Sequence, residues 1–337
     1  MTTNRAFGDE PFGHMPWRGF ALRITPRGEM QPMCAGLRSP CGINASPAGD
    51  LFYTDNQGEW CGAGKLSELI PGDFHGHPSG IASCADPLWK FAVPSEPPNG
   101  VLMPVAAKTI PHFRLPAAWF PYDKMGRSPA GFVWDETDGR FGPFKNQLFV
   151  GDQYQSSVMR VFPEQVNERW QGACFPFRVG LSSGVVRLAW GRDGSLFCGE
   201  TNRGWGSLDG KSAGLERLVW TGKMPFEMLA VRARPDGFEI EFTEPVDPAP
   251  AADVSSFDLE SYTYLLHKAY GSDEVDQQRL EVLSAVVGPD GRSVRIRADG
   301  LRSGYVHEIH ARVRSKTGAA LLHDAAYYTM IEIPRGG

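Results

Sequence analysis

Residues 41–69 read CGINASPAGDLFYTDNQGEWCGAGKLSEL, and the pattern of this stretch is written three times in the chain. Each copy has a first apolar run, a connecting segment, a second run that begins with Leu-Phe, and then a polar segment. The Leu-Phe pairs begin at Leu51, Leu148 and Leu196. An internal repeat is interpreted before any single motif because it determines the architecture.

The spacing of the repeat indicates a β-propeller. Each copy offers about four short strands over roughly 45 residues, which is the length of one propeller blade. The first strand is small and apolar, as at Ile43 and Ala45, which suits the crowded position near a propeller axis. A solenoid is the alternative, but the aromatic outer strands and the sharp turns favour blades.

The repeats do not add up to a closed ring. A strand pair at 20–34 resembles the outer half of a blade, so the chain holds about three and a half blades, whereas propellers have typically four to eight. We expect an N-terminally truncated propeller, or one whose missing half a second copy supplies. The first full blade should then expose its inner strand around Ile43-Asn44-Ala45, and this open edge predicts poor solubility or self-association.

The composition changes near residue 222. From residue 226 the Leu-Phe repeat stops, and runs such as Gly237–Phe242 and Ser293–Arg297 alternate apolar and charged residues. Several short strands of this kind predict an immunoglobulin-like sandwich. We therefore expect an all-β chain: a partial propeller over 1–222 with an irregular insertion at 71–128, followed by an Ig-like β-sandwich over 226–337.

Bulk properties exclude several classes of protein. The net charge is -5 and no Lys/Arg cluster occurs, so a nucleic-acid partner is not expected. No apolar run is long enough to span a membrane, and the N-terminus MTTNRAFGDE is not a signal peptide. The six cysteines lack Cys-x-x-Cys spacing, so no haem is expected. They are interpreted as reduced, buried thiols, and the alternative is that two of them form one disulfide.

Three acidic residues share one repeat position. Asp55, Asp152 and Glu200 each follow the second strand of a copy. Equivalent positions in a propeller lie on a ring, and three carboxylates at a common mouth would suit Ca²⁺. The alternative is that each carboxylate accepts hydrogen bonds from its own loop.

Two histidines are candidates for a catalytic base. His75 and His77 flank a glycine in a Pro/Gly-rich loop, and such a histidine could take a proton from a sugar hydroxyl. His77, which precedes a proline, is the better candidate. The alternative is a structural histidine bonded to the backbone.

Polar loop residues suggest where a ligand would bind. Gln153, Gln155, Asn202 and Arg203 offer amides and a guanidinium that could hold a carboxylated planar cofactor or a sugar ring. Asn56 and Gln57 lie on the same rim, and the segment WFPYDKMGRSPAG at 119–131 is a further candidate lining. The alternative is a cluster that only packs the loops together.

Seven motifs together carry a resemblance to one family: TDNQGEW (54–60), GDFHGHP (72–78), SPAGFVWDE (128–136), GDQYQSSVMRV (151–161), GETNRGWGS (199–207), YGSDEVD (270–276) and YVHEIHARVRS (305–315). Through them the chain resembles the membrane-bound dehydrogenase family common in planctomycete-like bacteria. The resemblance implies a propeller of NHL/glucose-dehydrogenase type, similar to the soluble quinone-dependent glucose and sorbosone dehydrogenases. It also implies a periplasmic location, and pyrroloquinoline quinone (PQQ) and Ca²⁺ as cofactors.

Two functions therefore remain open. The first is a quinone-dependent sugar or alcohol dehydrogenase, incomplete in this chain. The second is a non-catalytic module that binds a carbohydrate, another small polar ligand or a protein. Cys41, Ala130 and Val186, which align at the inner strands, are poor ligands for a hard metal and favour the second.

Overall fold

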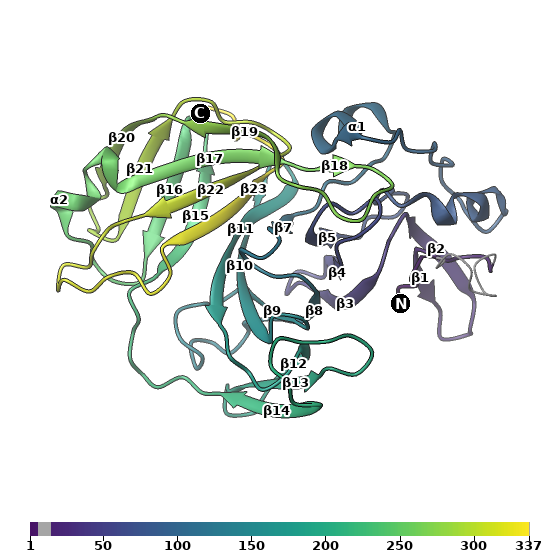
Figure 1. Cartoon of the computed structure of the whole chain (residues 1–337), viewed down its shortest axis with the longest axis horizontal. Helices are drawn as coiled ribbons and strands as arrows, with labels where there is room; N and C mark the ends of the chain where they lie inside the picture. The colour runs from purple at the N-terminus through teal and green to yellow at the C-terminus, as the bar shows by residue number, and fades with distance from the viewer. Residues whose placement is uncertain (6–14, 337) are drawn as a thin grey trace.

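The computed structural model describes residues 1–5 and 15–336, and it is almost entirely β-structure (Figure 1). Three antiparallel sheets follow the three sequence repeats. Blade A consists of β3 (Pro40–Ala45), β4 (Leu51–Asp55), β5 (Gly64–Glu68) and β7 (Ala118–Phe120). Blade B consists of β8 (Pro129–Trp134), β9 (Leu148–Asp152), β10 (Ser157–Val166) and β11 (Arg169–Arg178). Blade C consists of β12 (Val185–Trp190), β13 (Leu196–Thr201) and β14 (Ala213–Leu218).

The repeat alignment is confirmed in detail. Leu51, Leu148 and Leu196 each begin the second strand of a blade. The expected turn before Leu196 is present, because Gly194 adopts a positive φ of 82° and the Gly191 amide donates to the Ser195 carbonyl at 2.7 Å. Sequence periodicity therefore placed the second strand of each blade correctly.

The inner strands of the three blades lie side by side, as in a propeller. The Thr54 hydroxyl of blade A donates to the Ala130 carbonyl of blade B at 2.7 Å. The Trp190 indole of blade C donates to the Trp134 carbonyl of blade B at 2.6 Å. Because these bonds join successive blades across their faces, the all-β partial propeller is the observed architecture.

Small residues allow this close approach. A Cβ on Gly42 of β3 would lie 2.4 Å from the Ala130 carbonyl, and one on Gly151 of β9 would lie 2.7 Å from the side chain of Val185. Contacts under 3.0 Å are not tolerated, so glycine is required at these two contacts between blades.

A hairpin precedes blade A. It is formed by β1 (Phe20–Ile24) and β2 (Met30–Ala35), and it packs on blade A through Cys34, Tyr53 and Leu69. The exposure expected for the inner strand of blade A is also present, since 43% of the Ile43 surface is open and Asn44 and Ala45 are exposed.

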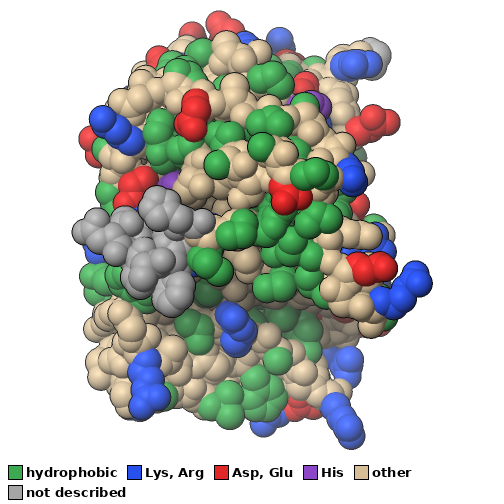
Figure 2. Space-filling view, turned by 90° about the vertical axis from the view of Figure 1, so that its right-hand side faces the viewer, with side chains coloured by type: hydrophobic (Ala, Val, Ile, Leu, Met, Phe, Trp, Pro, Cys, Tyr) green, Lys and Arg blue, Asp and Glu red, His purple; other side chains and the backbone are tan. Residues whose placement is uncertain are grey.

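The insertion at 71–128 is less irregular than expected. It contains η1 (Pro78–Ala85), β6 (Val101–Leu102), α1 (Met103–Thr109) and β7. The sequence Ala-Trp-Phe of β7 is fully buried and supplies the fourth strand of blade A, pairing with β5. Three residues are too short to show a strand period, which is why the sequence pattern missed it. Figure 2 views the face formed by the hairpin and this insertion, where apolar side chains gather and Lys and Arg are scattered singly.

Two sheets form the sandwich that follows. One sheet has the order β15 (Met228–Arg234), β16 (Gly237–Phe242), β21 (Ser293–Ala298) and β20 (Val282–Val287). The other contains β19 (Val275–Leu280), β17 (Phe257–Thr263), β22 (Tyr305–Ala311) and β23 (Ala325–Met330). The remaining short elements are α2 (Pro248–Ala251), η2 (Val254–Ser256) and β18 (Leu265–Leu266), which pairs with β6.

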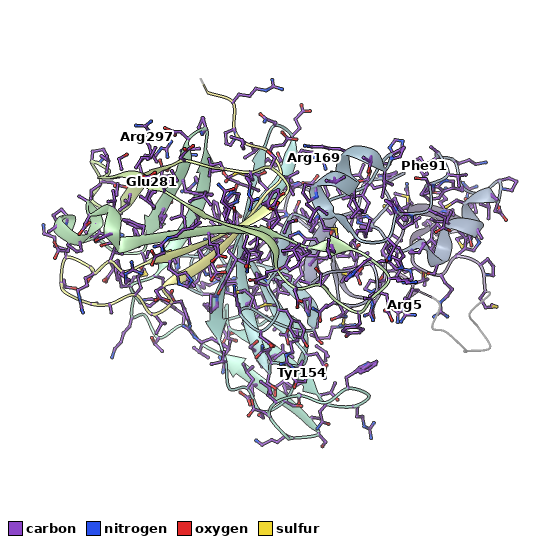
Figure 3. The ribbon with its side chains drawn as sticks, turned by 45° about the horizontal axis from the view of Figure 1, so that its top comes forward. Arg5, Phe91, Tyr154, Arg169, Glu281 and Arg297 are labelled. Carbon is purple, nitrogen blue, oxygen red and sulfur yellow. The ribbon has the colours of Figure 1, made fainter. Side chains whose placement is uncertain are left out.

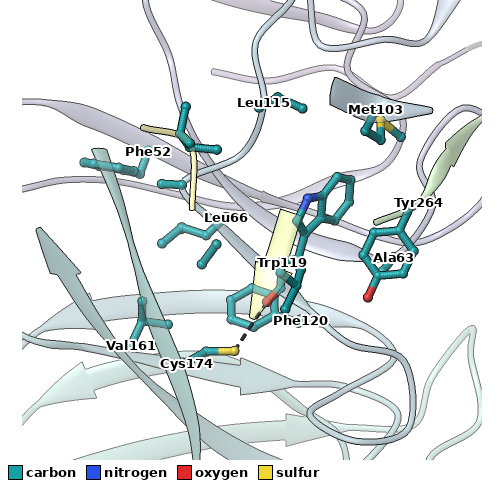
Figure 4. Close-up of a cluster of buried hydrophobic side chains, with 14 of the residues drawn as sticks. Phe52, Ala63, Leu66, Met103, Leu115, Trp119, Phe120, Val161, Cys174 and Tyr264 are labelled. Carbon is teal, nitrogen blue, oxygen red and sulfur yellow. Dashed lines mark hydrogen bonds between the residues drawn. The ribbon is translucent and has the colours of Figure 1, made fainter. Parts of the chain in front are cut away.

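The propeller and the sandwich share one sheet and one core. Strand β11 of blade B pairs with β23, so that eight strands form a continuous sheet. The buried Arg160 of β10 donates to the Met228 carbonyl at 2.6 Å and lies over the rings of Phe144 and Phe175. In the core, the Cys174 thiol contacts the Trp119 carbonyl at 3.3 Å (Figure 4). The strand pairing and the Arg160 bond fix blade B against the sandwich, and the Cys174 contact joins it to β7 of blade A.

No helix in the described residues is long and apolar enough to cross a membrane. All six cysteines are free thiols, and each of them except Cys41 is buried. Burial raises the pKa of Cys61 to about 12, so this thiol stays protonated at neutral pH.

Candidate functional site

The acid at the end of each second strand holds the backbone that leads into the first strand of its own blade. Asp55 accepts the amides of Arg38 at 3.0 Å and Ser39 at 2.6 Å, just before β3. Asp152 does the same just before β8, with the amides of Arg127 at 2.8 Å and Ser128 at 2.7 Å.

The third acid makes a weaker version of the same contact. Glu200 accepts the Ser183 amide at 2.9 Å, while its other oxygen is buried without a hydrogen bond in the described structure. Burial raises the pKa of Glu200, and the neighbouring Glu216 raises it further. At this repeat position the acid therefore has a structural role in all three blades, and we call Asp55, Asp152 and Glu200 the staple acids.

These contacts correct the calcium prediction. The oxygens of Asp55 and Asp152 are occupied by backbone amides, and the described residues contain no group of three or more His, Cys, Asp or Glu side chains able to hold a metal ion. The residues present therefore do not fit a Ca²⁺ site built from Asp55, Asp152 and Glu200. The alternative considered for the sequence, hydrogen bonds from the acid's own loop, holds in part. Asp55 accepts the Asn56 amide at 3.0 Å and Asp152 accepts the Gln155 amide at 2.7 Å, but the other amides come from the segment before the first strand.

The staples position two equivalent arginines. Arg38 and Arg127 each begin an Arg-Ser-Pro tripeptide, at 38–40 and 127–129, directly before the inner strand of blades A and B. The acid staple fixes the backbone of both tripeptides. The repeated tripeptide is the sequence signal that would have found these two residues, which the alignment of the Leu-Phe pairs left out.

Both arginines line a pocket of about 520 Å³ at the loop end of the blades. This size is typical of small-molecule sites. The lining residues come from the N-terminal segment, all three blades, and one loop each of the insertion and the sandwich: Asn4, Arg38, Ser39, Pro40, Cys41, Asn56, Tyr122, Arg127, Ser128, Gln153, Tyr154, Val186, Thr201, Arg203, Trp205, Gly206 and Tyr270. The predicted lining segment at 119–131 is confirmed through Tyr122, Arg127 and Ser128.

The structure brings together some of the predicted site residues and separates others. Asn56, Gln153 and Arg203 line the pocket. Gln57, Gln155 and Asn202 do not line it. The Gln57 side chain donates to the Gly62 carbonyl at 3.1 Å. The backbone amide of Gln155 donates to the Asp152 carboxylate at 2.7 Å, and the backbone amide of Asn202 donates to the Ser212 carbonyl at 3.3 Å.

Arg38 is held rigidly on one side of the pocket. Its guanidinium pairs with Glu59 at 2.9 Å and lies over the ring of Tyr270 at 5.2 Å from the centroid. A Cβ on Gly58 would lie 2.0 Å from the guanidinium carbon, so glycine is what makes room for it. The pKa of Glu59 is lowered: burial opposes this, but hydrogen bonds from its own amide and from Arg38 outweigh it.

Arg127 is held between two aromatic rings. Its guanidinium carbon lies 4.4 Å from the centroid of Tyr154 and 4.9 Å from that of Tyr122, and it pairs with Asp123. Tyr154 (Figure 3) also contacts the loop between β13 and β14 of blade C, because its carbonyl accepts the Leu208 amide at 2.8 Å. A cation stacked in this way keeps one orientation without losing its charge.

The third cation comes from the loop after β13. Arg203 is exposed and makes no ion pair with a residue that the structure describes. In the same loop, 75% of the Trp205 surface is open, and its carbonyl accepts the Gln153 side chain at 2.9 Å. The rim therefore offers a guanidinium that has no ion pair among the described residues, beside an open indole ring.

The histidines do not belong to this pocket. His75 is 1% exposed, packs edge to face on Tyr53, and neither ring nitrogen has a hydrogen-bond partner in the described structure. Burial holds its pKa well below the usual value. His77 caps η1, accepting the Ser79 amide at 3.2 Å, and burial lowers its pKa to about 3. Their prediction as catalytic bases is thus corrected to structural roles, because a base must reach the substrate proton.

Comparisons with known proteins give a distant match in fold only. No family model matches the sequence, and no curated protein is significantly similar to it. A protein from Thermus thermophilus assigned as an oxidoreductase (glucose dehydrogenase) is 20% identical, with a TM-score of 0.41 over 60% of this chain and 56% of its own. The PQQ-bound aldose sugar dehydrogenase from Streptomyces coelicolor is 18% identical, with a TM-score of 0.40 over 60% of this chain and 52% of its own. This chain thus spans about half the length of the structures it matches, and scores this low say nothing about its ligand.

Proposed function

We propose that the pocket binds a small ring compound that carries carboxylate groups. One observation carries the proposal: Arg38, Arg127 and Arg203 converge on a pocket whose described lining contains no Asp, Glu or His. Guanidinium groups bind carboxylates in a planar, two-pronged geometry. The rings of Tyr122, Tyr154 and Tyr270 and the open Trp205 would contact the faces of a ring compound.

Two ligands share this chemistry, an acidic sugar and a carboxylated quinone. The quinone would give the chain the role of a quinone-dependent sugar or alcohol dehydrogenase-like propeller, in the periplasmic location that the sequence resemblance implies. PQQ is planar and carries three carboxylates, so Arg38, Arg127 and Arg203 would hold it against the tyrosine rings. When bound, it would supply a two-electron acceptor for alcohol oxidation.

The second candidate is a binding module for an acidic carbohydrate. It is favoured by the chemistry of the lining, because a dehydrogenase also needs a base for the hydroxyl proton, and the polar side chains of the described lining offer only guanidinium, phenol, hydroxyl, indole, thiol and amide groups. In this case the sugar ring would stack on Trp205 and its carboxylate would pair with Arg203.

Titrating the chain with PQQ, glucuronate and glucose, followed by tryptophan fluorescence, tests the proposal. We expect the two carboxylated compounds to bind and glucose not to bind. Arg203→Gln should weaken binding about tenfold or more, the value of one charge-assisted bond. Arg27→Gln, in the exposed turn between β1 and β2, is the matched control. Equal affinity of the two variants would reject the proposal, and dye reduction with PQQ and a sugar would favour the dehydrogenase over the binding module.

A further inference from the structure

Strand β14 is an unprotected sheet edge. Blade A ends on β7, which lies against β11 and β23, and blade B continues into the sandwich through β23. Blade C has only three strands, and in the described residues the backbone of β14 pairs with no strand other than β13. An edge strand presents unpaired amides and carbonyls, which form a template for another strand.

Among the described edge strands of more than three residues, only β14 pairs with its neighbour in a regular register. Proteins protect edges with bulges, charges, proline or a covering segment. Within the described chain, each other edge strand of more than three residues pairs with its neighbour through an irregular register: β1, β2, β3, β8, β12, β15, β19 and β20. The pairing of β13 with β14 is regular from Leu196–Leu218 to Thr201–Ala213.

The side chains of β14 do not guard it either. Leu215 in the middle of the strand is 73% exposed, and Val219 just beyond it is 56% exposed. The two charges of the strand are used inside blade C: Glu216 accepts the Ser182 amide at 2.9 Å, and Arg217 pairs with Asp193. The edge is therefore regular, apolar at its centre and free of proline.

We propose that β14 pairs with β14 of a second copy of this chain, antiparallel about a two-fold axis at Leu215. Directly opposed residues of an antiparallel pair lie on the same face, so the axis must pass through a residue position. Centring on Glu216 or Arg217 would oppose like charges. Centring on Leu215 opposes leucine to leucine, Gly214 to Glu216 and Ala213 to Arg217, with no like-charge pair.

This arrangement joins the two blades C into one six-stranded sheet. It needs no rearrangement of the propeller, because outer strands lie at the rim of a propeller whatever packs on the blade faces. It also differs from the self-association predicted from the sequence, which was placed at Ile43-Asn44-Ala45. That inner strand has an irregular register between Pro40 and Ile43, and Asn44 bonds the Phe132 carbonyl of blade B at 3.2 Å.

Sedimentation velocity of the full chain, at concentrations up to about 100 µM, tests the pairing. We expect a reversible dimer. Leu215→Lys places two ammonium groups opposite each other and should weaken the dimer at least tenfold, about 1.4 kcal/mol. Leu283→Lys on the bulged edge β20 is the matched control, since Leu283 is 50% exposed, and it should leave the dimer intact.

A crosslink gives an independent readout of the register. Opposed residues in an antiparallel pair have Cα atoms about 4.5–5.5 Å apart, within the Cα range of a disulfide, so Leu215→Cys can be crosslinked across the axis. Oxidation should link this variant across the axis and should leave Leu283→Cys unlinked. A wild-type chain that stays monomeric at the highest concentration, or a dimer that Leu215→Lys does not weaken, would overturn the proposal.

Discussion

Blades B and C are written in the same repeat, yet blade B is packed on both faces and blade C on one. The difference is visible at one aligned position. A Cβ on Gly151 of β9 would lie 2.7 Å from Val185 of blade C, whereas a Cβ on Gly199 of β13 would meet nothing closer than 3.7 Å. In blade A the same position is Thr54, whose hydroxyl bonds Ala130 of blade B. The repeat thus supplies a small residue for a neighbouring blade, and the described residues place no blade against Gly199.

The staple acid of blade B also makes more contacts than the staple acid of blade C. Asp152 is fully buried and accepts the amides of Arg127, Ser128 and Gln155. Glu200 accepts the Ser183 amide and leaves one oxygen without a partner in the described structure. Blade B is therefore held by its own staple and by both neighbours, while blade C depends on fewer contacts. Residues at equivalent positions of a repeat therefore do not contribute equally to the free energy of unfolding.

The largest expected effect is the loss of the blade B staple. Asp152→Ala should lower the free energy of unfolding by about 3 kcal/mol, because three partly buried amides lose their charged acceptor. Glu200→Ala should cost about 1 kcal/mol, because one amide loses its acceptor. Urea unfolding followed by tryptophan fluorescence measures both. Equal losses for the two variants would break the comparison between the blades.

The next effect concerns the blade interface itself. Gly151→Ala should destabilise the protein by about 2 kcal/mol, because the added methyl group must displace Val185 in a packed interface. Gly199→Ala has room for the methyl group and should change stability by no more than about 0.5 kcal/mol. A large loss for Gly199→Ala would mean that something packs on the open face of blade C in solution.

A pH dependence of the free energy of unfolding, similar in size or smaller, distinguishes blade A from blades B and C. Blades B and C contain no histidine, whereas residues 73–77 beside blade A contain two. The pKa of His77 is about 3 in the folded protein, below its unfolded value of about 6.5, so its stabilising contribution is present above pH 6.5 and is lost as the pH falls towards 3. Between pH 7 and pH 5 the loss should be about 2 kcal/mol.

His77→Asn isolates this effect. Asparagine keeps an acceptor for the Ser79 amide and does not titrate. The variant should lose less stability than the wild type between pH 7 and pH 5, measured by urea unfolding at each pH. Identical losses would show that His77 does not remain neutral in the folded chain.

The sequence was informative where a pattern repeats and uninformative where a contact is unique. The Leu51, Leu148 and Leu196 alignment placed the strands of the blades because each blade must bury the same face. The role of the acids was misjudged because a carboxylate that binds amides and one that binds Ca²⁺ look alike in sequence. Tyr122 and Tyr270 come from segments outside the repeat, so no period pointed to Tyr270, and the composition of 119–131 alone pointed to Tyr122.

The pairing of β11 with β23 has a consequence for how the chain is made. Cys174 lies opposite Tyr327, so the outer strand of blade B gains its second neighbour only after more than 150 further residues have been synthesised. Until then an emerging chain carries β11 as a bare edge, and contacts so distant in sequence form slowly. A ribosome that stalls before residue 325 would therefore release a species prone to misassembly at blade B.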